Sequence, residues 1–147
     1  MRSMLDMLTM LTLGILILGG WRVYADARQE DRMIATAQLA KERIHSEIRL
    51  RSALAGSDVT DQGWVREVPM RWFQPAPLNP WFGSADRPWI EVAAPADARR
   101  RDPREIAVTR PEQASWWFNP GNGVVRARVP ELATNAATRT LYDLVNR

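Results

Sequence analysis

The chain has 147 residues, of which 46% are hydrophobic and 25% are charged, so its composition is that of a folded protein with one small domain and an appendage. It contains no cysteine, which excludes disulfides, thiolate metal sites and a cysteine nucleophile. The formal net charge is +3. Because acidic and basic residues are well mixed and no recognition motif appears, we expect no nucleic-acid partner.

The segment from Met7 to Trp21 contains no charged residue, and its only polar side chains are Thr9 and Thr12. A helix of this length rises about 22 Å, short of the roughly 30 Å hydrocarbon core of a bilayer. Extension to Tyr24 adds Arg22, whose guanidinium can snorkel to the headgroups. Trp21 and Tyr24 fall where aromatic belt residues occur. The segment therefore predicts a single-pass membrane anchor.

A cleaved signal peptide is the alternative interpretation of the same segment. Arg2 would be its basic region, Met7 to Leu18 its apolar region, and Ala25-Asp26-Ala27 its cleavage site. Asp6 beside the apolar region and the bulky Trp21 near the cleavage site favour the anchor.

The next stretch, Ala25 to Ala55, has no proline and continues the helical pattern. Together the two segments predict one helix from about Leu5 to Leu54, with Gly56 as its C-cap. His45, the single histidine, is expected to be a solvated helix residue. The apolar stripe, which we expect to pack on the protein's own β-sheet, consists of Ile34, Ala37, Ile44, Ile48 and Ala55, widened by Leu39 and Ala40. The opposite face carries Arg28, Arg32, Glu42, Arg43, Glu47 and Arg49.

After Gly56 the chain turns to proline, tryptophan and short β-like runs. Trp64 to Val68 is one such run. Residues 70–88 predict an ordered loop held down by aromatic side chains: Trp72, Phe73, Trp81 and Phe82. Trp89 to Ala93 and Ile106 to Thr109 are predicted strands. The arginine-rich segment Pro95 to Glu105 between them predicts a solvated loop, with contact to acidic lipids as the alternative.

The clearest local signal is a β-hairpin, with strands at Ser115–Asn119 and Val124–Val129 around an Asn-Pro-Gly-Asn-Gly turn. We expect this hairpin to form the centre of the head's sheet. The alternation predicts that Val125, Ala127 and Val129 face the helix, whereas Arg126 and Arg128 face away. A short terminal helix follows, using Leu141, Leu144 and Val145. The fold class is therefore α+β, a long N-terminal helix packed on a small antiparallel sheet. The expected domains are 1–56 for the helix and 57–147 for the head.

No phosphate loop, dinucleotide fingerprint, zinc-protease helix or nucleophile elbow occurs in the sequence. The acidic pairs Glu30-Asp31 and Asp58-Asp61 lack apolar surroundings that would tune them. We therefore expect no enzymatic activity, no cofactor, no metal and no small-molecule substrate. The seven tryptophans could line a ligand groove, although they more often stabilise a small head.

An apolar half-helix with a carboxylate near its start, an amphipathic second half and a small β-rich head resemble the type IV pilin and type II secretion pseudopilin family. Leu5-Asp6-Met7-Leu8 resembles the start of the pilin helix, with Asp6 in the place of the family's glutamate. Gly14 lies where pilin helices often carry a glycine. Tyr24 and Asp26 resemble the aromatic and polar residues at which that helix leaves the membrane. In the head, 79–83 and 88–92 are similar to the loop-to-strand passage of major pseudopilins. The family's Gly-Phe-Thr processing sequence and acidic calcium loop are missing.

The resemblance implies a divergent or minor structural subunit of a pseudopilus or pilus-like assembly. It would sit in the bacterial inner membrane by a single pass, with its head on the periplasmic side and other pilin-like subunits as partners. The residues implied in membrane insertion and assembly are Asp6, Met7, Leu11, Gly14, Leu18, Trp21, Arg22 and Tyr24. In the family, the carboxylate at the position of Asp6 pairs with a neighbour's terminal amine. The alternatives are that Asp6 lies at headgroup level, or that the chain is a tethered or secreted ligand-binding module with a Trp-rich face.

Overall fold

The computed structural model describes residues 2–56, 58–83 and 87–147, and for 2–24 and 26 it describes the main chain alone. By their internal contacts the residues separate into two units, 1–33 and 34–147. The second unit contains the later part of the N-terminal helix together with the whole β-rich head.

The first element, α1, is an α-helix of 53 residues from Arg2 to Leu54. The predicted continuous helix is thus confirmed, and its continuity follows from the absence of proline over this range. Gly56, just past its end, has a φ of 58°, the left-handed conformation that lets glycine end a helix. The predicted C-cap is therefore confirmed as well.

The head contains a three-stranded sheet in the order β1-β3-β4, formed by β1 (Ile90–Val92), β3 (Trp116–Asn119) and β4 (Val124–Ala127). The two later strands are antiparallel, with Trp117 opposite Arg126 and Phe118 opposite Val125. The predicted hairpin is therefore confirmed. Its second strand is at the edge of the sheet, so the expectation that the whole hairpin lies at the centre is wrong.

A second, two-stranded sheet pairs β2 (Ala107–Val108) with β5 (Val129–Pro130) in parallel. β1 also runs parallel to β3, with Glu91 beside Trp117. The prediction of an antiparallel sheet is therefore wrong for β1 and β2, because each of them pairs in parallel with its neighbour. Val129 belongs to this second sheet and not to the hairpin, because β4 ends at Ala127.

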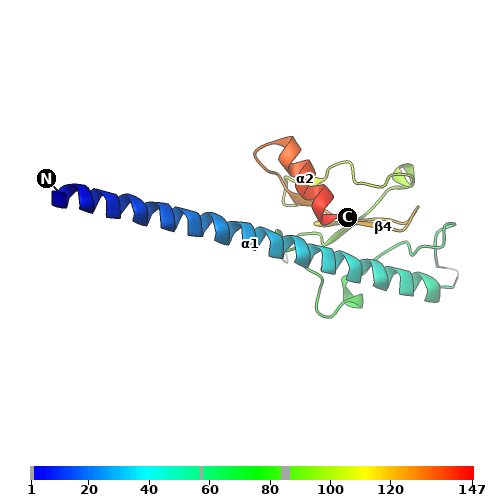
Figure 1. The fold of residues 1–147 in the computed structure, drawn as a ribbon. Helices are drawn as coiled ribbons and strands as arrows, with labels where there is room; N and C mark the ends of the chain where they lie inside the picture. Colours follow the sequence, from blue (N-terminus) through cyan, green and yellow to red (C-terminus); the bar gives the residue numbers. More distant parts are fainter. Residues whose placement is uncertain (1, 57, 84–86) are drawn as a thin grey trace. The chain divides into compact units, whose positions relative to one another are not determined.

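The later part of α1 supplies the helical side of the core, and its residues Ala37, Ile44 and Ile48 are each 0% exposed. They cluster with buried side chains of the strands and of the C-terminal helix α2 (Asn135–Val145). Figure 1 shows β4 and α2 next to this part of α1. The predicted packing of the apolar stripe on the protein's own sheet is confirmed, except that Leu39 is 73% exposed.

The predicted C-terminal helix is confirmed, with Leu141 and Val145 buried and Leu144 half-buried. Its N-cap is Thr134, whose hydroxyl accepts from the main-chain N–H of Ala137, an arrangement that stabilises the first turn. Tyr142 is buried on the same face. The helix therefore closes the core with one amphipathic face.

The β-like run at Trp64–Val68 does not form a strand, because only an isolated bridge joins Val59 and Val65. Segment 70–83 is packed as predicted: Phe73 is buried, and Trp72 and Trp81 pack against the core. Gly123 has a φ of 74°, and an added Cβ would overlap the ring of Trp64. The turn of the hairpin therefore needs glycine there.

Candidate functional site

The eight residues predicted for membrane insertion and assembly lie along α1, and their side chains are outside the described ones. They are Asp6, Met7, Leu11, Gly14, Leu18, Trp21, Arg22 and Tyr24. The structure thus places their main chain in a helix. Within the part of the chain whose placement is described, no helix is long and apolar enough to span a bilayer.

The best-defined polar site joins α1 to the end of α2, and we call it the α1–α2 clasp (Gln38, Lys41 and residues 144–147). The Lys41 ammonium donates to the main-chain oxygens of Val145 at 3.3 Å and Arg147 at 2.7 Å. Gln38 donates to the Leu144 oxygen at 2.8 Å. These carbonyls are at the C-terminal end of a helix, where cations are favoured. The clasp therefore holds α2 against α1.

Burial gives the clasp its electrostatic character. Lys41 is 5% exposed, and burial lowers the pKa of its ammonium, partly offset by the nearby Glu42. Asn146 completes the site, since its side chain exchanges two hydrogen bonds, each of 2.9 Å, with the main chain of Ala127. This amide therefore satisfies the main-chain donor and acceptor of Ala127 at the edge of the sheet.

Next to the clasp, Tyr142 donates its hydroxyl proton to Asp102 at 2.8 Å, and Arg126 donates to the same carboxylate oxygen at 3.1 Å. Burial, followed by the hydrogen bond to Asp102, raises the pKa of Tyr142 well above its usual range. The phenol therefore stays protonated and acts as a donor. The triad ties α2 and β4 to the loop that precedes β2.

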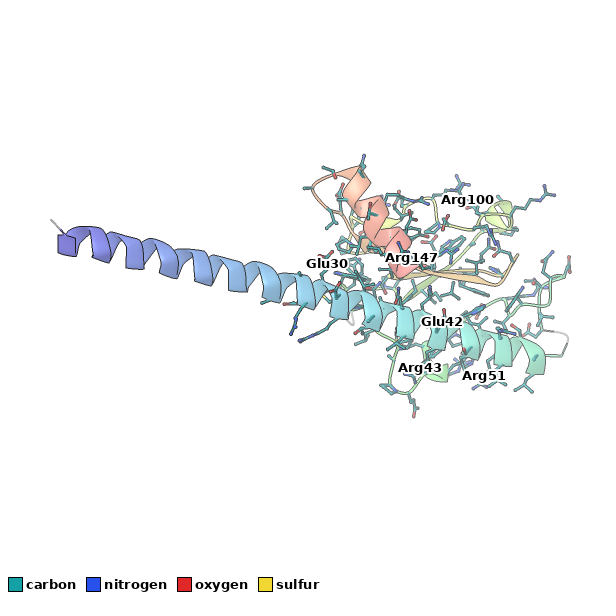
Figure 2. The ribbon with its side chains drawn as sticks, in the orientation of Figure 1. Glu30, Glu42, Arg43, Arg51, Arg100 and Arg147 are labelled. Atoms are coloured by element: carbon teal, nitrogen blue, oxygen red, sulfur yellow. The ribbon has the colours of Figure 1, made fainter. Side chains whose placement is uncertain are left out.

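His45 faces a groove of about 240 Å³ between α1 and β4, which Lys41, Glu42 and Val125 also line. Arg147 lies at the same groove, near Glu42 (Figure 2). The imidazole is stacked on Trp64, with ring centroids 6.3 Å apart. His45 is half-buried, so the prediction of a solvated helix residue is only partly correct.

Burial lowers the pKa of His45 below 6.5, with Glu42 opposing the shift and Arg49 reinforcing it. In the unfolded chain the imidazole gains its proton near pH 6.5, whereas in the fold it gains it at lower pH. The unfolded state therefore binds more protons below pH 6.5, and the free energy of unfolding should fall as the pH is lowered through this window. Because His45 is the only histidine, an NMR titration of its ring measures the pKa directly. His45→Gln is the control, and a pKa at or above 6.5 would contradict the expected direction.

The tryptophans of the head are used mainly for packing. Trp116 and Trp117 are buried, and Trp116 donates its ring N–H to the Pro77 oxygen at 3.0 Å. Trp64, Trp81 and Trp89 pack against the core. A hollow of about 490 Å³ between the last turn of α1 and segment 65–72 has Trp72 in its wall. An open face formed by several tryptophans, as the ligand-binding alternative requires, is not seen in the described residues.

Two further buried polar residues organise the strands. Arg128 is 3% exposed and donates to Glu91 at 2.7 Å, as well as to two main-chain oxygens. The prediction that it faces solvent is therefore wrong, because its partners lie in the layer that covers this side of the hairpin. Asn79 donates to the oxygens of Ser115 and Arg128. No group of three or more acidic or histidine side chains in the described residues could hold a metal ion.

Sequence reasoning missed Lys41 as a structural residue, although a signal was present. Lys41 is the only lysine of the chain, and it falls between Ala37 and Ile44 at helical spacing on the buried stripe. Asn146 gave no such signal, since its partner is in a strand that is distant in sequence. The described side chains thus form a network that joins helix, sheet and loops.

The chain was compared with protein-family models, with curated proteins and with solved structures, and none of the three comparisons finds a match.

Proposed function

We propose that this protein is a non-enzymatic, pilin-like subunit, anchored in the bacterial inner membrane by the first part of α1 and assembling with other pilin-like subunits. The observation that carries the proposal is the double use of one helix. Its residues 7–21 are apolar and uncharged, whereas its later residues Ala37, Ile44 and Ile48 are wholly buried in the core of the head.

This arrangement supports an assembly role because residues 34–54 of the helix are packed into the head along their apolar stripe. The apolar stripe, the clasp at Lys41 and the groove at His45 all join residues 34–54 to the head. A ligand-binding module on a tether needs no such attachment. A subunit that assembles through its helix does, because the head has to stay attached to that helix in the assembly.

Membrane attachment is tested by fractionation of cells that express the chain. We expect the intact protein in the membrane fraction after a carbonate wash, since residues 7–21 are apolar and uncharged and Trp21 and Tyr24 lie at their end. Intact mass of the recovered protein distinguishes the anchor from a signal peptide cut near Ala25. Recovery of a shortened, soluble protein would contradict the anchor and favour a secreted module instead.

Assembly is tested at Asp6, because a carboxylate at the edge of an apolar segment is costly unless it is paired. Asp6→Ala should leave the protein folded and membrane-bound and abolish cross-linking between neighbouring subunits. A cysteine at the exposed Ala35 supplies the cross-link, since the chain has no other. Glu30→Ala removes an exposed acidic side chain of the same helix and is the matched control. Equal cross-linking in both variants would remove the assembly role from Asp6.

A further inference from the structure

The net positive charge of the chain is concentrated on one segment, residues 97–104, which we call the arginine loop. It contains four exposed arginines, Arg99, Arg100, Arg101 and Arg104. Its two aspartates, Asp97 and Asp102, leave the segment with an excess of two positive charges, and Arg126 adjoins it by donating to Asp102. The formal net charge of the whole chain is +3.

The loop's two aspartates neutralise only two of these arginines closely. Arg104 forms a forked pair with Asp97 at 2.8 to 3.2 Å, and Arg126 is 3.1 Å from Asp102. Arg100 approaches Asp97 only to 3.9 Å. Arg99 and Arg101 make no side-chain hydrogen bond or ion pair with any residue that the structure describes. Their guanidinium groups are thus available to an external anion.

The main chain of the loop is held in place from inside the head. The side-chain amide of Asn119, which is 0% exposed, donates to the carbonyl oxygens of Asp97, Ala98 and Arg100 at 2.9, 3.2 and 2.8 Å. Arg126 donates to the Arg101 oxygen at 3.1 Å. These carbonyls therefore direct their negative ends inward. A loop fixed in this way loses little conformational entropy when it binds.

The chemistry of the loop selects the kind of partner. Protein interfaces usually have apolar or aromatic anchors at their centre, and the arginine loop contains none. The exposed large hydrophobic side chains of the described residues lie elsewhere, at Leu39, Leu50, Leu54, Met70, Leu78 and Leu132. Anionic lipid surfaces attract basic segments through their collective field, without an apolar anchor. Arg100 projects from the side of the head away from Arg43 and Arg51 of α1 (Figure 2).

We propose that the arginine loop is a docking surface for the headgroups of anionic phospholipids, with Arg99, Arg100 and Arg101 as the contacting residues. This surface is separate from the assembly role proposed above. The interaction is electrostatic, so salt should weaken it.

The test measures how the full chain partitions onto vesicles of phosphatidylcholine alone and onto vesicles that also contain phosphatidylglycerol. The ratio of the two partition coefficients isolates the effect of lipid charge, because the apolar N-terminal segment contributes to both. Each arginine near such a surface contributes roughly fivefold, so Arg99→Gln/Arg100→Gln/Arg101→Gln should lower the ratio on the order of a hundredfold. Failure of the anchor would leave this ratio measurable, so the two proposals fail separately.

The matched control, Arg49→Gln/Arg71→Gln/Arg147→Gln, removes the same charge from three exposed arginines elsewhere. Its ratio of partition coefficients should stay close to that of the unaltered chain. The variant with lysine at 99, 100 and 101 should also keep it, since a lipid field acts on charge and not on the guanidinium fork. An unchanged ratio in the glutamine variant, or an equal loss in the control, would overturn the proposal. Loss of the ratio in the lysine variant, together with tight binding to a glutamate-rich peptide, would overturn it in favour of an acidic protein partner.

Discussion

Val125→Asp should lower the free energy of unfolding by about 2 kcal/mol or more, since it places an unpaired charge in the core. Val125 is 4% exposed and lies in the cluster that includes Ile44 and Ile48 of α1. Lys41 lines the same groove as Val125, but its ammonium already donates to the oxygens of Val145 and Arg147. Urea denaturation followed by tryptophan fluorescence measures the loss.

The neighbouring residue supplies the matched control. Val124 is in the same strand but is only half-buried, so Val124→Asp should cost clearly less. An equal effect of the two substitutions would show that the strand as such, and not the contact with α1, determines the loss. Unchanged stability in Val125→Asp would mean that the helix does not cover this face.

Asn119→Ala should cost about 2 kcal/mol or more, because it removes a fully buried amide that donates to the oxygens of Asp97 and Ala98 and shares the Arg100 oxygen with Asn122. The Asn119 side chain donates to three main-chain oxygens and accepts from the N–H of Gly121 at 2.8 Å. The substitution removes the link between the hairpin turn and the arginine loop. We expect a lower melting temperature and larger backbone motion at residues 97–101 by NMR relaxation.

Asn122 is the matched control for this second experiment. It belongs to the same turn and donates to the Arg100 oxygen at 2.8 Å, but it is half-exposed, so water can replace its hydrogen bonds. Asn122→Ala should therefore cost well under half as much. Equal losses of stability in the two variants would contradict the prediction that burial makes the hydrogen bonds of Asn119 the more important ones.

The parts of the fold that could be predicted are those whose signal is local. The hairpin follows from the alternation of Val125 and Ala127 and from a turn that needs glycine at 123. The later part of α1 follows from helical spacing on the buried stripe. The parallel pairing of β1 with β3 could not be predicted, because it joins segments separated by a long loop whose path depends on side-chain contacts such as that of Asn119 with Arg100.

Polar residues in the interior were the least predictable part of the candidate site. Period-two alternation places Arg128 on the outer face, and nothing adjacent in sequence indicates that Glu91 lies there to meet it. For Leu39 the prediction of a packed side chain is wrong, since Leu39 flanks the helical stripe but no described part of the head covers it. In both cases the outcome depends on which distant segment covers a face, which the local pattern does not contain.

The burial of Lys41 allows one junction of the fold to be followed by chemical labelling. An amine-acylating reagent finds one lysine side chain in the sequence, and in the fold that amine is enclosed by the oxygens of Val145 and Arg147. Acylation at this position therefore requires the end of α2 to detach from α1. The rate of modification at Lys41, read by mass spectrometry on the peptide that contains it and not on the terminal amine, would follow the opening of this one junction.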